Sequence, residues 1–154
     1  MKIEEEIKQG SFESEQQRLM INIIYTGSQF TLANNRMLKE YDLTSQQFNV
    51  LRILRGQKGN PLSLKEIEQR MLDRSSNGSR LVEKLLKKGM IERVICEEDR
   101  RRIELTITSK GLRLLDKIDE NHEGMKEGLK AAITEEEARI ANQILDKFRN
   151  INQL

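Results

Sequence analysis

Apolar positions along the chain predict a mostly helical protein. Between about Glu13 and Glu40, apolar residues recur at steps of four and seven, among them Leu19, Ile23 and Phe30. Such steps place side chains on one face of an α-helix. We therefore expect a single long helix in this part of the chain.

Two shorter helices are expected next, each opened by a capping box. The pattern of Ser or Thr followed three residues later by Glu or Gln occurs at Thr44 and again at Ser63. In this pattern the two side chains satisfy backbone N–H groups at the start of a helix. It predicts one helix that ends near Gly56 and a short second helix that ends near Leu72.

A further helix carries Leu81, Val82, Leu85 and Leu86 on one side and ends in two lysines before Gly89. A basic last turn followed by glycine is a typical helix stop. We expect a turn of three or four residues between this helix and the previous one. Two short helices joined in that way form a helix-turn-helix.

The period then changes from helical to alternating. Ile103, Leu105 and Ile107 alternate with polar residues, which is typical of a half-buried β-strand. Residues 90–95 are a suitable antiparallel partner, and residues 96–101 would form the tip of the hairpin. A helix-turn-helix followed by such a hairpin is a winged helix.

Helical spacing returns after Thr108. Leu112, His122 and Leu129 belong to a stripe with steps of three and four, and we expect a second long helix to carry this stripe. A capping box at Thr134 predicts one more helix at the end of the chain.

The expected fold class is mainly α (α+β), with a winged helix-turn-helix core and long flanking helices. In this interpretation residues 1–154 form a single chain in which residues 43–108 are the DNA-binding lobe. Residues 1–42 and 109–154 are then the helices that hold a dimer together.

The terminal segments carry more apolar surface than the small winged core can cover. Long helices with such stripes bury them most simply against a second copy in a symmetric dimer. The alternative is that these segments fold back on their own chain. The residues expected in the dimer interface are Leu19, Ile23, Leu115, Ile118, Met125, Ile144, Phe148 and Ile151.

Composition narrows the possible chemistry. The 154 residues include one cysteine and one histidine, which excludes an internal disulfide and leaves no cysteine- or histidine-based metal cluster. The sequence contains no glycine-rich phosphate loop and no serine or cysteine with a plausible partner base. We expect no enzymatic activity, no cofactor and no metal.

Hydropathy gives no sign of a membrane segment. The longest apolar stretch, Met20–Tyr25, is far shorter than the roughly 20 residues that cross a bilayer. The first residues are acidic, unlike the basic start of a signal peptide. We expect a cytoplasmic protein with no membrane partner.

Charge is distributed unevenly along the chain. The net charge is +2, but residues 74–111 hold ten Lys and Arg side chains against six Asp and Glu side chains. A basic centre between mildly acidic ends is typical of a chain that binds nucleic acid, and double-stranded DNA is the expected partner.

Several motifs in this region resemble the MarR family of winged-helix transcription regulators. They are the runs Glu66–Met71, Ser79–Leu85, Lys88–Arg93, Glu98–Arg101 and Leu105–Thr108. The resemblance extends over almost the whole chain. It implies a homodimer whose recognition helices enter neighbouring major grooves while its wings reach minor grooves. It also implies that small molecules or oxidants release such regulators from DNA.

Two positions depart from the family pattern. Leu72 and Asp73 stand where the family often has Gly-Val, and Gly78 stands where an apolar residue is usual. We expect Gly78 to weaken its helix by about 1 kcal/mol relative to alanine and to remove a core contact. The fold is expected to tolerate this, but the base preference is open.

Residues for DNA contact follow from which helix faces remain outside the apolar stripe. Asn77 suits adenine, and Arg80 suits guanine or a phosphate, while the start of the helix attracts phosphates through its free N–H groups. The alternative for Arg80 and Lys84 is a solvated face that pairs with Glu83. The resemblance implies that Arg101 enters a minor groove and that Asp99 orients it; the alternative is an exposed, solubilising hairpin. The full set of expected DNA contacts is Ser75, Ser76, Asn77, Ser79, Arg80, Lys84, Asp99, Arg100 and Arg101.

Other residues have two interpretations each. Cys96 is expected to be a structural thiol, with a redox role as the alternative. His122 is expected to serve packing or the surface rather than effector sensing. Tyr25, Phe30 and Tyr41 would line a cleft for a small-molecule effector, although ordinary core aromatics have the same pattern.

The sequence therefore predicts a homodimeric, sequence-specific DNA-binding regulator, with repression at an inverted-repeat operator as its mode of action. A non-specific architectural DNA binder is the first alternative. A winged-helix protein-interaction module without DNA binding is the second.

Overall fold

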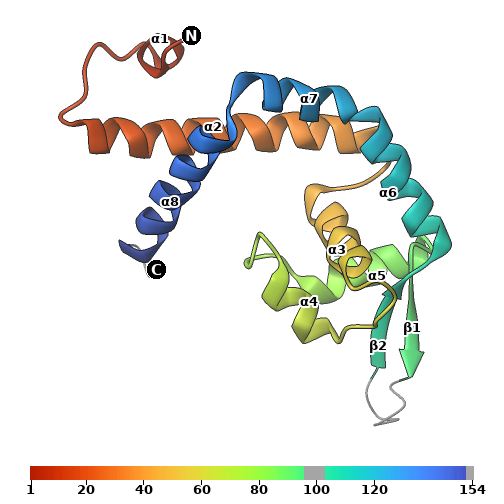
Figure 1. Ribbon diagram of the computed structural model, residues 1–154. Coiled ribbons are helices and arrows are strands. Elements are labelled where there is room, and N and C mark those ends of the chain that lie inside the picture. Colours follow the sequence, from red (N-terminus) through yellow and green to blue (C-terminus); the bar gives the residue numbers. More distant parts are fainter. Residues whose placement is uncertain (96–102, 152–154) are drawn as a thin grey trace. The chain divides into compact units, whose positions relative to one another are not determined.

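The computed structural model describes residues 1–95 and 103–151. It is mostly helical, with one two-stranded antiparallel sheet in the described part of the chain (Figure 1). The elements in chain order are α1 (Ile3–Ile7), α2 (Glu15–Lys39), α3 (Ser45–Gly56), α4 (Leu64–Arg70), α5 (Gly78–Lys87), β1 (Ile91–Ile95), β2 (Ile103–Ile107), α6 (Ser109–Asn121), α7 (Glu123–Ala132) and α8 (Glu135–Ile151).

The chain divides into two compact units, Met1–Leu112 and Arg113–Leu154. The first unit holds α1 to α5, both strands and the start of α6. The second unit holds the rest of α6 together with α7 and α8.

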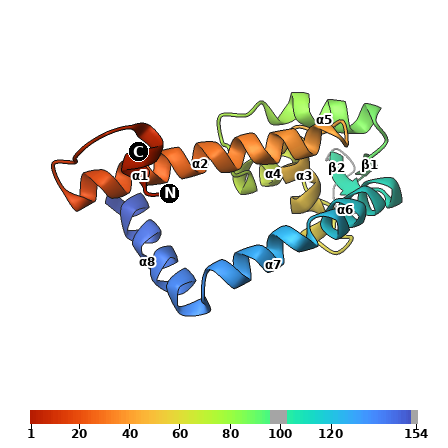
Figure 2. The same ribbon diagram turned by 90° about the horizontal axis from the view of Figure 1, so that it is seen from above.

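The expected long helix is α2, which runs unbroken over 25 residues (Figures 1 and 2). Its start is capped by Ser14, whose hydroxyl accepts the backbone N–H of Gln17 at 3.1 Å. This hydrogen bond satisfies one of the N–H groups that a helix leaves unpaired at its start.

The short helix α1 was not expected from the sequence. Five residues are too few to establish a helical period. In the structure α1 is held by contacts with the rest of its unit: Ile3 is buried, and Arg18 of α2 forms a 2.9 Å ion pair with Glu4.

Both expected capping boxes are present, which confirms the starts of α3 and α4. Thr44 accepts the N–H of Gln47 at 3.2 Å, and the Gln47 side chain accepts the N–H of Thr44 at 3.1 Å. Ser63 and Glu66 form the same reciprocal pair. Helix α4 ends at Arg70, two residues before the expected position.

The turn between α4 and α5 is longer than expected. Seven residues, 71–77, separate the two helices instead of three or four. Asp73 gives this segment its own structure, because its carboxylate accepts the N–H of Ser75 at 3.0 Å and the hydroxyl of Ser76 at 2.8 Å. A side chain that bonds to residues two and three further on builds a turn, and the helix then begins only after Asn77.

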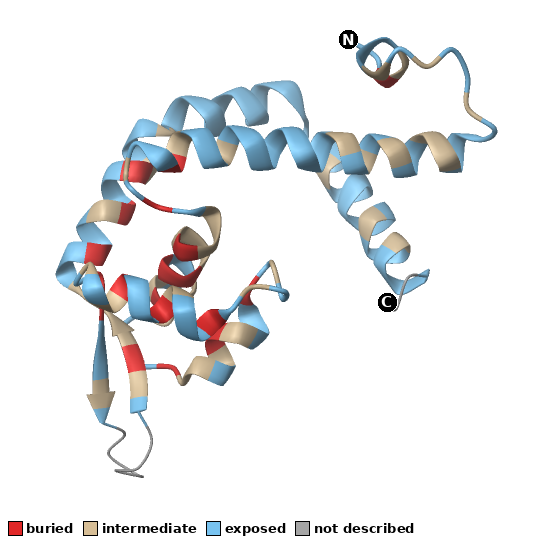
Figure 3. Ribbon diagram, turned by 180° about the vertical axis from the view of Figure 1, so that it is seen from behind, coloured by how far each residue is buried: buried red, intermediate tan, exposed pale blue. Residues whose placement is uncertain are grey.

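The hydrophobic core of the first unit lies among α3, α4, α5 and the sheet (Figure 3). Each such buried side chain stabilises the folded state by roughly 1.5–3 kcal/mol. The large side chains that are fully buried in this unit are Leu38, Val50, Leu51, Leu54, Ile67, Leu85 and Ile91.

The expected antiparallel pairing of the two strands is confirmed. Ile91 pairs with Ile107 and Ile95 with Ile103 in the antiparallel sheet. Leu105 is buried, whereas Ile103 and Ile95 are more than half exposed. The apolar face of the hairpin is thus covered only at its base, and the exposed isoleucine pair borders residues 96–102.

The prediction of a single long helix after Thr108 is wrong, because the chain forms two helices there, α6 and α7. The break lies at His122, whose backbone N–H donates to Asp119 at 3.3 Å instead of continuing the helical pattern. The ring Nδ1 of His122 lies 2.6 Å from the carbonyl oxygen of Ile118, the acceptor that the His122 N–H would use in an α-helix. The imidazole thus takes the place of a helical hydrogen bond.

The last helix starts as expected. Thr134 accepts the N–H of Glu137, and the Glu137 carboxylate accepts both the N–H and the hydroxyl of Thr134. These hydrogen bonds lower the pKa of Glu137, and the one from the backbone N–H of Thr134 is the largest cause. Neither α7 nor α8 contains a buried residue (Figure 3).

Candidate nucleic-acid interface

Helix α5 separates an apolar face from a polar one. Val82 and Leu85 are buried and Leu81 and Leu86 half-buried, as the sequence predicts. The exposed residues of the helix are Ser79, Arg80, Glu83, Lys84 and Lys87. Packing of the leucine side therefore presents a mostly basic face to solvent.

Two of the exposed charges on this side are already paired with each other. Glu83 of α5 forms an ion pair and a hydrogen bond with Arg93 of β1. Within the part of the chain that the structure describes, Glu83 forms no ion pair with Arg80 or Lys84. The cations of α5 are thus not neutralised by the one carboxylate on their own helix.

Asn77 is the N-cap of α5. Its side-chain oxygen accepts the backbone N–H of Arg80 at 3.0 Å. The cap engages one lone pair of the Asn77 oxygen and fixes the orientation of the side chain, while its amide NH₂ group can donate to an acceptor on DNA. From the sequence, Asn77 is predicted to contact a base, and its role as the N-cap of α5 is missed. Asparagine is nevertheless a preferred N-cap residue.

Ser75 and Ser76 donate their hydroxyl protons to Asp73, at 2.6 and 2.8 Å. These hydrogen bonds, with Ser75 the largest cause, lower the pKa of Asp73 to about 2. Gln46 of α3 adds a longer contact of 3.5 Å to the same carboxylate. The hydrogen bonds to Asp73 therefore orient the two serines and form the turn from protein groups alone.

Gly78 is the first residue of α5 and is buried against Glu68 of α4. A Cβ atom at Gly78 would lie 2.4 Å from Glu68 Oε1 and 2.6 Å from its Cγ. The expectation that this glycine weakens the helix interior and leaves a core contact empty is wrong, because it stands at the helix start and gives room to Glu68. The Glu68 carboxylate also lies beside the end of the helix where phosphate attraction was expected.

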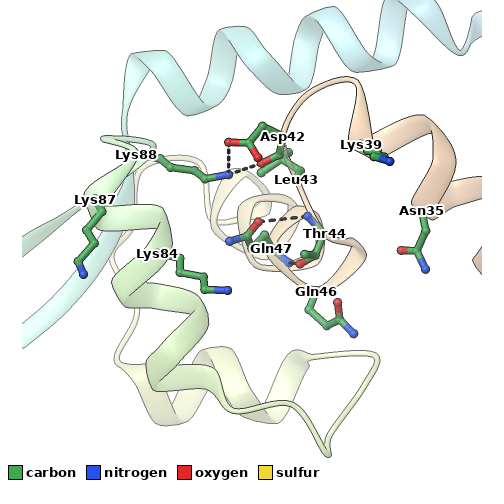
Figure 4. A pocket seen from close by; sticks show the side chains of 10 residues that line it. All are labelled: Asn35, Lys39, Asp42, Leu43, Thr44, Gln46, Gln47, Lys84, Lys87 and Lys88. Atoms are coloured by element: carbon green, nitrogen blue, oxygen red, sulfur yellow. Dashed lines mark hydrogen bonds and ion pairs between the residues drawn. The ribbon is translucent and has the colours of Figure 1, made fainter.

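A basic groove of about 760 Å³ lies beside α5 (Figure 4). Lys84, Lys87 and Lys88 line it from α5 and its C-cap, and Lys39 lines it from the end of α2. Asp42 is the one acidic residue in its lining, and its carboxylate pairs with Lys88. Of these four lysines, only Lys84 is predicted from the sequence to contact DNA, because the apolar stripe of α5 says nothing about the helices around it.

The tip of the wing lies outside the described residues. Asp99, Arg100 and Arg101, with Cys96, all belong to the segment 96–102. Their expected roles remain predictions from the sequence.

Two of the three expected effector-cleft aromatics lie together. Tyr25 and Phe30 of α2 line a cavity of about 360 Å³ with residues of α1, and Tyr41 is not part of that lining. The Tyr25 hydroxyl donates to the Glu6 carboxylate at 2.7 Å, and this hydrogen bond raises the pKa of Tyr25.

The residues expected in a dimer interface fall into three groups according to their exposure. Leu115 and Ile118 are fully buried within the single chain, so they are not accessible to a second copy. Ile23 and Phe148 are half-buried. The exposed members are Leu19, Met125, Ile144 and Ile151.

The described residues contain no group of three or more His, Cys, Asp or Glu side chains placed to hold a metal ion. None of the described helices is both long enough and apolar enough to cross a membrane.

Comparison with known proteins relates this chain to one family. Residues 41–102 match the MarR family. The transcriptional regulator PecS of Dickeya dadantii is 27% identical over 108 residues, which are 68% of this chain and 64% of PecS. The matched part is thus less than two thirds of the length of that relative.

Solved structures share the fold at lower sequence identity. The DNA complex of MepR from Staphylococcus aureus has a TM-score of 0.73 at 20% identity, over 87% of this chain and 96% of MepR. A MarR-like regulator from Bacillus cereus has a TM-score of 0.72 at 19% identity, over 90% and 99% of the two chains. The organohalide-sensing regulator RdhR, bound to 2,4-dichlorophenol, has a TM-score of 0.74 at 22% identity, over 94% and 87%.

The family match covers the segment from α3 to the wing, which contains the basic face of α5. Over most of its length, this chain has the fold of MarR-family regulators. On these grounds residues 41–102 are similar to the MarR family, and the chain has the fold of winged-helix MarR regulators.

Proposed function

We propose that this chain is a sequence-specific DNA-binding regulator that acts as a homodimeric repressor on an inverted-repeat operator. Helix α5 is the recognition helix in this proposal. Its exposed residues enter the major groove, and the wing residues Arg100 and Arg101 contact the minor groove, with Asp99 orienting Arg101.

The basic face of α5 is the observation that carries the proposal. Arg80, Lys84 and Lys87 are exposed on one rigid helix, and the adjacent Glu83 is paired with Arg93. Phosphate contacts from such side chains supply most of the affinity for DNA, and an arginine at a base edge supplies discrimination. The DNA complex of MepR supports DNA binding by a protein of this fold.

Exposed apolar side chains on the terminal helices support the homodimer. Large contiguous apolar surfaces on a single chain are typical of interfaces, and two-fold pairing would place two recognition helices about one turn of DNA apart. Leu115 and Ile118 are left out of this interface because they are already buried. The exposed large apolar side chains of α7, α8 and the two residues between them are Met125, Leu129, Ile133, Ile140, Ile144 and Ile151.

An effector that releases the DNA would bind in the cavity of Tyr25 and Phe30. Its volume of about 360 Å³ is within the range of small-molecule sites. Two aromatic side chains and the Glu6 carboxylate suit an aromatic ligand with a hydrogen-bond donor. The ligand-bound structure of RdhR supports effector control in a protein of this fold.

Selection of bound sequences from a random DNA pool tests the function. We expect enrichment of one inverted repeat, a discrete footprint on it, and loss of affinity as salt is raised. A footprint without sequence preference would indicate an architectural binder. Binding that is absent at low salt would overturn the proposal in favour of a protein-interaction module.

A further inference from the structure

The C-terminal end of helix α5 is held from two sides. Lys88 is the C-cap of the helix, and both its side chain and its carbonyl group bond to other elements of the first unit. Gly89 follows it with φ of 65°, a conformation that glycine adopts without strain. This end of the helix therefore has a defined position in its unit.

On one side, Lys88 reaches the corner between α2 and α3. Its Nζ lies 2.8 Å from Asp42 Oδ2 and also donates to the backbone carbonyl of Asp42 (Figure 4). Asp42 itself has φ of 53°, in the left-handed region that Asp and Asn tolerate better than most residues. The ammonium group thus bonds to both the side chain and the main chain of one turn residue.

On the other side, the junction of β2 and α6 holds the same end. Lys110 Nζ donates to the carbonyl oxygen of Lys88 at 2.7 Å, and Thr108 Oγ1 donates to the carbonyl oxygen of Gly89 at 2.8 Å. Donors at the last carbonyls of a helix stabilise its end.

We propose that Lys88 is a positioning residue that ties α5 to the α2–α3 corner and thereby sets the angle at which the helix presents its DNA-contacting face. This inference rests on the proposed function of α5 as the recognition helix. It assigns Lys88 a role that differs from that of its neighbour Lys87, whose side chain is exposed and forms no hydrogen bond or ion pair within the described part of the chain.

A small change of angle at this end has a large effect at the other. Ten residues of α-helix span about 15 Å, so a tilt of roughly 10° at Lys88 moves the start of α5 by about 2.5 Å. That displacement is close to the length of a hydrogen bond. Ser79 and Arg80, near the start of the helix, would lose contacts that need correct geometry.

The contact is suited to positioning rather than to stability. The Asp42 side chain is 94% exposed, whereas the Lys88 side chain is 26% exposed. Exposed ion pairs contribute little to the stability of a fold. Variants of this pair should therefore fold, and their effect on DNA binding should be a few-fold change.

The sign of one substitution separates positioning from simple electrostatics. Asp42→Asn removes a negative charge beside the basic groove, so electrostatic attraction alone predicts tighter DNA binding. Loss of the tie to Lys88 predicts weaker binding instead. Asparagine keeps the left-handed turn of residue 42 accessible, so the substitution tests the ion pair and not the backbone.

The experiment measures operator and scrambled-duplex affinities across a salt series for wild type, Asp42→Asn, Lys88→Met, Lys88→Arg and Lys87→Met. We expect Asp42→Asn to bind the operator about twofold to fivefold more weakly and Lys88→Met about threefold to tenfold more weakly. For both, the dependence of log affinity on log salt should keep the wild-type slope, and scrambled duplex should be affected less. Lys88→Arg should restore most of the operator affinity.

Lys87→Met is the matched control, because it removes the same charge from the adjacent position. If Lys87 contacts a phosphate, its loss should reduce the salt slope by about 0.9. The proposal is overturned if Asp42→Asn binds as tightly as wild type or more tightly, or if Lys88→Met reduces the slope as a phosphate contact does. If Lys88→Met does not fold, as shown by thermal unfolding, Asp42→Asn still decides. Failure of the wild-type chain itself to prefer operator would refute the proposed function instead.

Discussion

The side-chain oxygen of Asn77 accepts the backbone N–H of Arg80 at 3.0 Å, and so caps the helix that carries the exposed basic face. Asn77→Ala should therefore reduce the free energy of unfolding by about 1 kcal/mol. Asn77→Asp should retain most of that stability, because a carboxylate also caps. Urea unfolding measures both, with the exposed Ser79→Ala as the control variant; equal stability of Asn77→Ala and wild type would show that the cap is not needed.

Asp73 predicts a dependence of stability on pH. Because the folded protein holds its pKa at about 2, below the value of about 3.9 in an unfolded chain, the ionised form stabilises the fold. This contribution is complete above the unfolded pKa and is lost as pH falls towards 2.

The difference in free energy of unfolding between wild type and Asp73→Asn should accordingly be constant from about pH 5 to 8 and shrink between about pH 4 and 2. Urea unfolding at several pH values checks this window. Ser75→Ala, which removes the largest cause of the lowered pKa, should weaken the dependence in the same range. A difference that stays constant down to pH 2 would rule out this account of Asp73.

The close approach of Gly78 to Glu68 predicts a change of sign between two backgrounds. In wild type, Gly78→Ala should destabilise by about 1 kcal/mol, because the new Cβ meets the Glu68 side chain. In a Glu68→Ala background the same substitution should be neutral or stabilising, since alanine is the better helix former. Thermal unfolding of the four proteins gives the coupling, and additive effects would mean that the two residues do not interact.

Arg101 in the wing predicts an effect on the salt dependence of DNA binding. Arg101→Ala should weaken operator binding and reduce the slope of log affinity against log salt, because fewer counterions are released. Loss of Arg80 should instead cost about 1–3 kcal/mol in discrimination between operator and scrambled duplex if its guanidinium makes a bidentate base contact. Binding measured across a salt series separates the two, and an unchanged slope for Arg101→Ala would remove the wing from the DNA interface.

The exposed apolar face of α8 predicts that the proposed homodimer depends on this helix. Ile144→Asp should shift the protein towards the monomer, because an aspartate in an apolar interface loses its solvation without gaining a partner. Sedimentation at micromolar concentration measures the mass, and Gln143→Asp on the same exposed helix is the matched control. If Ile144→Asp remains a dimer to the same extent as Gln143→Asp, the interface lies elsewhere.

The sequence by itself determined the elements that depend on local rules. The capping boxes at Thr44, Ser63 and Thr134 predicted helix starts correctly, because their hydrogen bonds join residues three apart. The alternation at Ile103, Leu105 and Ile107 predicted the strand, since side chains of a strand point to opposite faces in turn.

Only the tertiary structure decided what depends on contacts between distant residues. The space that Glu68 takes at Gly78 and the tie between Lys88 and Asp42 join residues of different helices, and no local period carries that information. The break at His122 is local, but a ring that replaces a backbone donor leaves the apolar stripe intact, so periodicity alone predicted a continuous helix. The burial of Leu115 and Ile118 likewise came from packing within the chain, because a helical stripe shows that a face is covered but not by which surface.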